Sequence, residues 1–185
     1  MEKYRNRLLT ISILLCSVML LIAVSAVKGD ERYDEALRLN NEAGPLIDEN
    51  KDLERAIKLM NKAIELVPNN SRFYYNRGEA LTRSGNHALA IKDFTKSIEL
   101  DPGDYGGYYS RGIVYYLFSK NYLGAVEDFN KAIERNPKIP GAYSMRGLSF
   151  RQLGLMSKAC EDLKKACDMG DCLAWEHVKK TGECY

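Results

Sequence analysis

Large and small apolar residues follow one another along residues 37–171 in an arrangement that returns about every 34 positions. Four segments carry apolar residues at intervals of three and four, and each opens on an alanine: Ala56, Ala90, Ala125 and Ala159. A proline follows the first three segments, at positions 68, 102 and 137. Such intervals place side chains on one face of a helix, and proline ends a helix. The pattern therefore predicts a helix in each segment.

A second helix is predicted before each of the last three segments. Its mark is a tyrosine four residues before a glycine, as in Tyr74–Gly78, Tyr108–Gly112 and Tyr143–Gly147. Because glycine lets two helices approach closely, we expect the alanine of the following segment to lie against it. Tyr74, Tyr108 and Tyr115 share the glycine face, which predicts that they fill the core.

This pattern resembles the tetratricopeptide-repeat (TPR) family, in which helix–turn–helix units of about 34 residues stack side by side. The resemblance covers about residues 37–171. It implies an all-α fold, a right-handed superhelical α-solenoid closed by a C-terminal capping helix. The expected divisions are residues 1–26 as a signal peptide or signal anchor, 27–36 as the lead-in to the first helix, 37–70 as a degenerate first repeat, 71–104, 105–139 and 140–170 as repeats two to four, and 171–185 as the capping helix and tail.

Two repeats depart from the family pattern. The first has Asn40 where an aromatic residue belongs, and Pro45 follows its glycine directly. Since proline removes a helical hydrogen bond, we expect that helix to break or kink there. The third repeat has one extra residue near Lys120 and Asn121, which we expect in the turn between its two helices.

A charged pair recurs in repeats two to four but not in the first. The residues are Arg77, Arg111 and Arg146, each directly before the repeat glycine, and Asp93, Asp128 and Asp162, each three residues after the alanine. The first repeat has Ala43 and Leu59 at these positions. A half-buried charge without a partner is costly, so the joint presence and joint loss predict structural ion pairs. A row of arginines that binds an anion is the alternative.

Four cysteines lie within 25 residues near the C-terminus: Cys160, Cys167, Cys172 and Cys184. In an exported chain they predict two disulfides. Cys167 and Cys172 are neighbours across a turn, and the returning chain brings Cys184 toward Cys160, so we expect these two pairings to hold the capping helix. A zinc site with His177 is the rival hypothesis, but no C-x-x-C pair is present. No metal and no cofactor are expected.

The first part of the chain predicts export. Lys3, Arg5 and Arg7 precede a stretch without charge, residues 8–27, which is long enough to cross a bilayer. A cleavage site after Ala26 is acceptable, so a cleaved signal is favoured over a retained anchor. Either form places the repeats in the periplasm or on the extracytoplasmic face, with membrane contact only through residues 8–27.

The remaining chain, from residue 27 onward, has 24 basic and 24 acidic side chains. A domain without net charge has no global attraction for nucleic acid. We therefore expect no nucleic-acid partner.

In the TPR family the first helix of each repeat lines a concave groove, and the resemblance assigns twelve groove residues here. They are Arg72, Tyr75, Asn76, Glu79, Arg83, Tyr109, Ile113, Tyr116, Leu117, Leu148, Arg151 and Gln152. This wall is aromatic and apolar at its centre and basic at both ends. Tyrosine and arginine often dominate binding energy at interfaces. Only Asn76 matches the carboxylate clamp that some TPR proteins use.

The sequence contains no combination of nucleophile, base and acid, and no phosphate-binding loop. We therefore expect a non-catalytic scaffold of the cell envelope that binds a peptide or helical segment of a partner protein. The alternative is a membrane-anchored structural subunit of a secretion, pilus or cell-wall complex. A thiol-based metal-binding protein is a third and weaker hypothesis.

Overall fold

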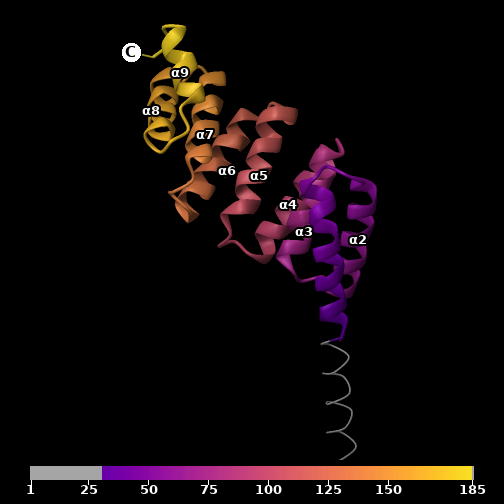
Figure 1. Cartoon of the computed structure of the whole chain (residues 1–185). Helices are drawn as coiled ribbons and strands as arrows, with labels where there is room; N and C mark the ends of the chain where they lie inside the picture. Colours follow the sequence, from indigo (N-terminus) through magenta and orange to yellow (C-terminus); the bar gives the residue numbers. More distant parts are fainter. Residues whose placement is uncertain (1–30, 185) are drawn as a thin grey trace, which may run out of the picture.

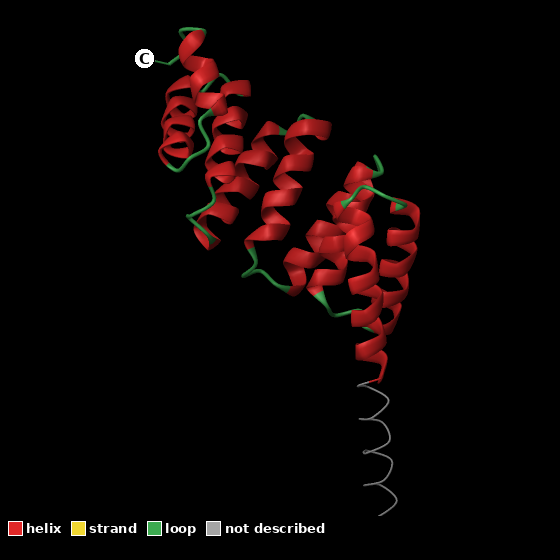
Figure 2. Ribbon diagram, viewed as in Figure 1, coloured by secondary structure: helices red, strands yellow, loops and turns green. Residues whose placement is uncertain are grey.

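The computed structural model describes residues 31–184, and this part of the chain is helical without a strand (Figures 1 and 2). Residues 31–48 form the first described helical stretch. It is followed by α2 (Leu53–Leu66), α3 (Ser71–Arg83), α4 (His87–Leu100), α5 (Tyr105–Val114), the π-helical turn η1 (Tyr115–Ser119), α6 (Tyr122–Arg135), α7 (Pro140–Gln152), α8 (Met156–Asp168) and α9 (Leu173–Lys180).

The helices stack in chain order, so that helix 31–48 and α9 lie at opposite ends (Figure 1). α3 packs on α4, α5 on α6 and α7 on α8, and each pair also contacts the next. The last helix, α9, packs on α8. This arrangement confirms the all-α solenoid of helix–turn–helix repeats.

Local sequence sets the helix ends. The Asn70 and Asp104 side chains accept hydrogen bonds from the first-turn amides of α3 and α5, as N-cap residues do. At the other end, α2, α4 and α6 each stop two residues before a proline, which cannot continue a helix.

The repeat glycines face large side chains, and at Gly147 a Cβ would also lie 3.1 Å from the carbonyl oxygen of the expected alanine, Ala159. A Cβ on Gly78 would lie 2.8 Å from Phe94, and one on Gly112 would lie 2.9 Å from Phe129. Gly147 faces Leu163 at 2.9 Å in the same way. These partners are four residues after the alanines, so the glycines make room for a buried ring or leucine and not for backbone contact alone.

The tyrosines expected in the core are only half-buried, and that prediction is wrong. The fully buried aromatic residues are instead Phe73, Phe94 and Phe129. Tyr74 and Tyr115 lie beneath the guanidinium groups of Arg77 and Arg111, 5.6 and 5.9 Å from ring centre to Cζ.

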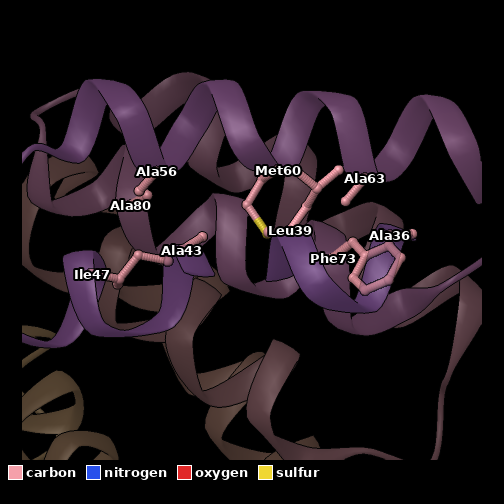
Figure 3. Close-up of a cluster of buried hydrophobic side chains, with 9 residues drawn as sticks. All are labelled: Ala36, Leu39, Ala43, Ile47, Ala56, Met60, Ala63, Phe73 and Ala80. Carbon is pink, nitrogen blue, oxygen red and sulfur yellow. The ribbon is translucent and has the colours of Figure 1, made fainter. Parts of the chain in front are cut away.

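Helix 31–48 continues through Pro45, so the expected break is absent. Pro45 lies in the last turn and is exposed, and the Glu49 amide donates a hydrogen bond of 3.0 Å to its carbonyl. A proline so near the helix end removes one bond without interrupting the element. The degenerate first repeat keeps a packed core with α2 and α3, in which Leu39, Met60 and Phe73 meet (Figure 3).

The extra residue of the third repeat is accommodated inside the helix and not in the turn after it. α5 widens into the π-helical turn η1, and Lys120 then reverses the chain at φ 52°. A single inserted residue is commonly absorbed as such a bulge. As a result, Leu117 and Phe118 are exposed at the surface.

The predicted signal segment lies outside the described residues. None of the described helices is both long and apolar enough to cross a membrane.

Candidate partner-binding groove

Two adjoining hollows lie along α3 and α5. The smaller, of about 380 Å³, lies between α3 and the end of helix 31–48. The larger, of about 690 Å³, runs from α3 past the start of α5 to Ile139 before α7. Arg72, Tyr75 and Asn76 line both hollows, which makes them one continuous surface that we call the groove.

Half of the twelve residues assigned from the sequence line this groove: Arg72, Tyr75, Asn76, Glu79, Arg83 and Tyr109. The other six lie outside both hollows, on α5, η1 and α7: Ile113, Tyr116, Leu117, Leu148, Arg151 and Gln152. Sequence reasoning missed Asp101, Asp104, Tyr105 and Ile139, which line the larger hollow. They lie in or beside the turns between repeats, where the family pattern gives no signal.

Tyrosine rings form the floor of the groove by covering glycines of the next repeat. The Tyr75 ring packs on Phe94 (5.8 Å between ring centres), and a Cβ on Gly106 would lie 3.3 Å from its Cε2 atom. Tyr109 packs on Phe129 at 5.9 Å, and a Cβ on Gly141 would lie 2.6 Å from its hydroxyl oxygen. The core therefore holds both tyrosine rings in place. Because Gly106 and Gly141 have no side chain, the rings are not covered by one at these positions.

Two polar groove residues hold the first repeat in place. Asn76 Nδ2 donates to Asn40 Oδ1 at 2.6 Å. Arg83 donates to the carbonyls of Ile47 and Asp48, at the end of helix 31–48. The guanidinium thus offsets the negative end of that helix, and the expected basic end of the wall is engaged within the protein.

The arginine–aspartate pairs join the two helices of repeats two to four. In the third repeat, Arg111 donates to both carboxylate oxygens of Asp128, at 2.8 and 2.7 Å. The same two-bond contact joins Arg77 to Asp93 and Arg146 to Asp162. Hydrogen bonding to the aspartates raises the pKa of all three arginines, while burial raises the pKa of Asp128.

Each of these arginines also reaches back to the preceding repeat. The third guanidinium nitrogen, Nη1, donates to Asn61, Thr95 or Asn130 at 2.7–2.8 Å. These three acceptors occupy one repeat position, directly before a lysine, so the sequence contained a signal that we did not use. The arginines therefore stabilise the stacking of repeats as well as each helix pair.

Comparison with known proteins agrees with this architecture. Residues 71–104 and 113–171 match tetratricopeptide-repeat family models. The chain belongs to the tetratricopeptide-repeat family. A comparison with curated protein sequences finds no match.

Solved TPR structures superimpose well on this chain. A crystal structure of MamA is 25% identical, with a TM-score of 0.68 over 79% of this chain and 81% of that one. MamA 41-end from Desulfovibrio magneticus RS-1 is 23% identical, with a TM-score of 0.69 over 81% and 94%. The first TPR of Spaghetti (RPAP3) bound to the HSP90 peptide SRMEEVD is 21% identical, with a TM-score of 0.63 over 66% and 95%. The last two similarities concern the fold alone.

The C-terminal cap of this TPR chain carries two disulfides, Cys160–Cys184 and Cys167–Cys172. Cys184 is 4% exposed and packs with Leu163 and Val178, so one bridge fastens the tail to the core of the cap. Within residues 31–184 no group of three or more histidine, cysteine or acidic side chains is placed to hold a metal ion.

Arg151, assigned to the groove from the sequence, instead binds the tail. It donates to both carboxylate oxygens of Glu183 at 2.6 Å. This hydrogen bond raises the pKa of Arg151 and lowers the pKa of Glu183 to about 2. Arg151, at the second basic end of the expected wall, is thus paired within the protein, as Arg83 is at the first end.

The Arg151–Glu183 pair is expected to make the stability of the cap depend on pH. A lowered carboxyl pKa stabilises the folded chain above about pH 4.5, and this contribution is lost as the pH falls toward about 2. Glu183→Gln removes the titrating group while keeping the shape of the side chain. The difference in thermal midpoint between wild type and Glu183→Gln should narrow as the pH is lowered across this range. A constant difference would show that the pair does not contribute.

Proposed function

We propose that this chain is a non-catalytic scaffold of the cell envelope that binds a segment of a partner protein in the groove. The observation that carries the proposal is the continuous hollow with a floor of fixed tyrosines. Rigid aromatic side chains supply large contact area at a small entropic cost. Because the core already holds Tyr75 and Tyr109, binding would not have to order them.

The other polar side chains described above have structural roles, which agrees with the tyrosines being the residues that bind. Asn76, Arg83 and Arg151 connect elements of the fold, and the arginine–aspartate pairs stabilise the stack. TPR repeats commonly present such a groove as an interaction surface. The RPAP3 structure, with its bound peptide, is an example of the fold in complex with a short segment.

The envelope location is supported by two features. Disulfides persist in oxidising compartments and are rare in the cytosol, and the cap has two. The uncharged residues 8–27 behind a basic start are typical of an export signal. We therefore place the partner among envelope proteins.

Filling the groove is expected to weaken binding without unfolding the protein. Gly106→Leu adds a side chain whose Cβ would lie 3.1 Å from Asp104 Oδ2 and 3.3 Å from Tyr75 Cε2, and it replaces a helical glycine by a better helix former. Random dodecapeptides displayed on phage would be selected on the full-length chain in a mild detergent. The selected peptides would then be titrated against wild type and Gly106→Leu by fluorescence polarisation.

Ser157→Leu, which adds the same side chain at an exposed position of α8, is the matched control. We expect Gly106→Leu to weaken binding at least about tenfold and Ser157→Leu to leave it unchanged. Equal binding by wild type and Gly106→Leu would place the interaction site elsewhere. Circular dichroism of both variants checks that the helices are retained.

A further inference from the structure

The side chains that line the groove give it a negative charge. Its acidic residues are Asp48, Glu79, Asp101 and Asp104, and its basic residues are Arg72 and Arg83. Arg83 is engaged by the carbonyl end of helix 31–48. In the larger hollow, two carboxylates therefore face one guanidinium, that of Arg72.

The two carboxylates of the larger hollow are held in fixed positions. Asp101 Oδ1 accepts from the Gly103 amide at 3.1 Å, and Asp104 Oδ1 accepts from the Gly106 amide at 3.2 Å. Both residues are exposed. Each of these bonds uses only one oxygen of its carboxylate, so the groups are oriented by the turn and still reach solvent.

A serine that lines the same hollow as these carboxylates departs from the repeat pattern. The equivalent position holds Ala63, Ala132 and Ala166 in the other repeats, all fully buried, but it holds Ser97 in the second. Ser97 is 3% exposed and lines the larger hollow. Its hydroxyl makes no hydrogen bond to any other residue in the described part of the chain. Since this hydroxyl is not sealed from solvent, it opens toward the hollow, one helical turn before Asp101, the residue that follows the end of α4.

Tyrosine rings complete the surroundings of this hydroxyl. Tyr75, Tyr105 and Tyr109 line the same hollow, and the face of an aromatic ring attracts a cation. Burial, followed by the charge of Glu79, raises the pKa of Tyr75. Burial, followed by the charge of Asp171, raises the pKa of Tyr109. The carboxylates of Glu79 and Asp104 contribute to the raised pKa of Tyr75 after burial, and this negative charge would favour a bound cation.

We propose that the partner segment places a lysine or arginine side chain in the larger hollow, between the rings of Tyr75, Tyr105 and Tyr109. Its cationic group donates to the carboxylates of Asp101 and Asp104 and to the hydroxyl of Ser97. This inference rests on the proposed function and adds the chemistry of the partner: a basic peptide segment. The acidic peptide SRMEEVD in the RPAP3 structure has the opposite character.

The test uses the selected dodecapeptides, each synthesised also with its lysine replaced by norleucine or its arginine by citrulline. Asp101→Asn and Asp104→Asn keep the hydrogen bonds to the turn amides but remove the charge, since asparagine caps as well as aspartate. Ser97→Ala installs the residue that the other three repeats carry. We expect at least about tenfold weaker binding for each asparagine variant and about three- to tenfold weaker binding for Ser97→Ala.

Removing the cation from the peptide should weaken binding to wild type by a similar factor, and it should have little further effect on the doubly substituted Asp101→Asn/Asp104→Asn variant. Selected peptides that share no basic residue, or that bind the asparagine variants as well as wild type, would overturn the inference and leave the proposed function standing. If no peptide were enriched, or if Gly106→Leu bound every peptide as well as wild type does, the proposed function would fail and the inference with it.

Discussion

Asp128→Ala is expected to lower the free energy of unfolding by about 3–5 kcal/mol. Asp128 is 4% exposed, and it accepts two hydrogen bonds from Arg111, whose side chain is 17% exposed. Removing the carboxylate leaves a half-buried guanidinium whose remaining contacts within the described part of the chain are Thr95 Oγ1, at 2.8 Å, and the ring of Tyr115. Leaving one charge of such a pair without its partner destabilises a protein by more than the intact pair stabilises it.

The first repeat supplies the matched control for this substitution. It has Ala43 and Leu59 at the two positions, and both pack in the core of that repeat. The double variant Arg111→Ala/Asp128→Leu copies this apolar pair into the third repeat. Because it buries no unpaired charge, it should be clearly less destabilised than Asp128→Ala.

The free energies of unfolding of wild type, Asp128→Ala and the double variant are measured by urea unfolding of the full-length chain, monitored by far-UV circular dichroism. If the free energy of unfolding of Asp128→Ala is within about 1 kcal/mol of that of wild type, Arg111 is solvated in the variant and the pair does not stabilise the fold. If the double variant is as unstable as the single variant, then lost packing, and not the exposed charge, explains the result.

The elements that recur could be predicted from the sequence, because each repeat provides a check on the others. The period of 34 residues predicted the helix pairs, and the joint loss of charge at Ala43 and Leu59 pointed to the residues that the structure brings together. The expected break at Pro45 was wrong because a general rule about proline was applied without knowing how close the residue is to the helix end.

Only half of the residues assigned to the groove from the sequence line it. The family pattern assigns residues to helix faces, but it does not tell which other segments of the chain lie against those faces. Arg83 and Arg151 occupy groove positions in the sequence, but each is engaged by a segment far along the chain. The acids of the larger hollow come from the turn between α4 and α5, where the family pattern is silent. The sequence therefore predicted a wall with basic ends, whereas the assembled hollow is acidic.

Breaking the Cys160–Cys184 bridge is expected to destabilise the folded chain by about 3 kcal/mol, and breaking Cys167–Cys172 by about 2 kcal/mol. The two bridges close loops with sequence separations of 24 and 5 residues. In the chain-entropy description, the longer loop restricts the unfolded chain more and so stabilises the folded state more. The longer bridge also holds Cys184 against Leu163 and Val178, the buried centre of the cap.

Thermal unfolding of Cys160→Ala/Cys184→Ala and Cys167→Ala/Cys172→Ala tests this order. For a domain of this size, 1 kcal/mol corresponds to about 2–4 °C, so the longer bridge should account for about 6–12 °C. A phosphine reductant should lower the midpoint of wild type and leave a variant without all four cysteines unchanged. An unchanged wild-type midpoint would mean that the thiols are not joined in the folded protein. The support that the disulfides lend to an oxidising compartment would then be lost, although the groove and its tyrosines, which lie in other repeats, would be unaffected.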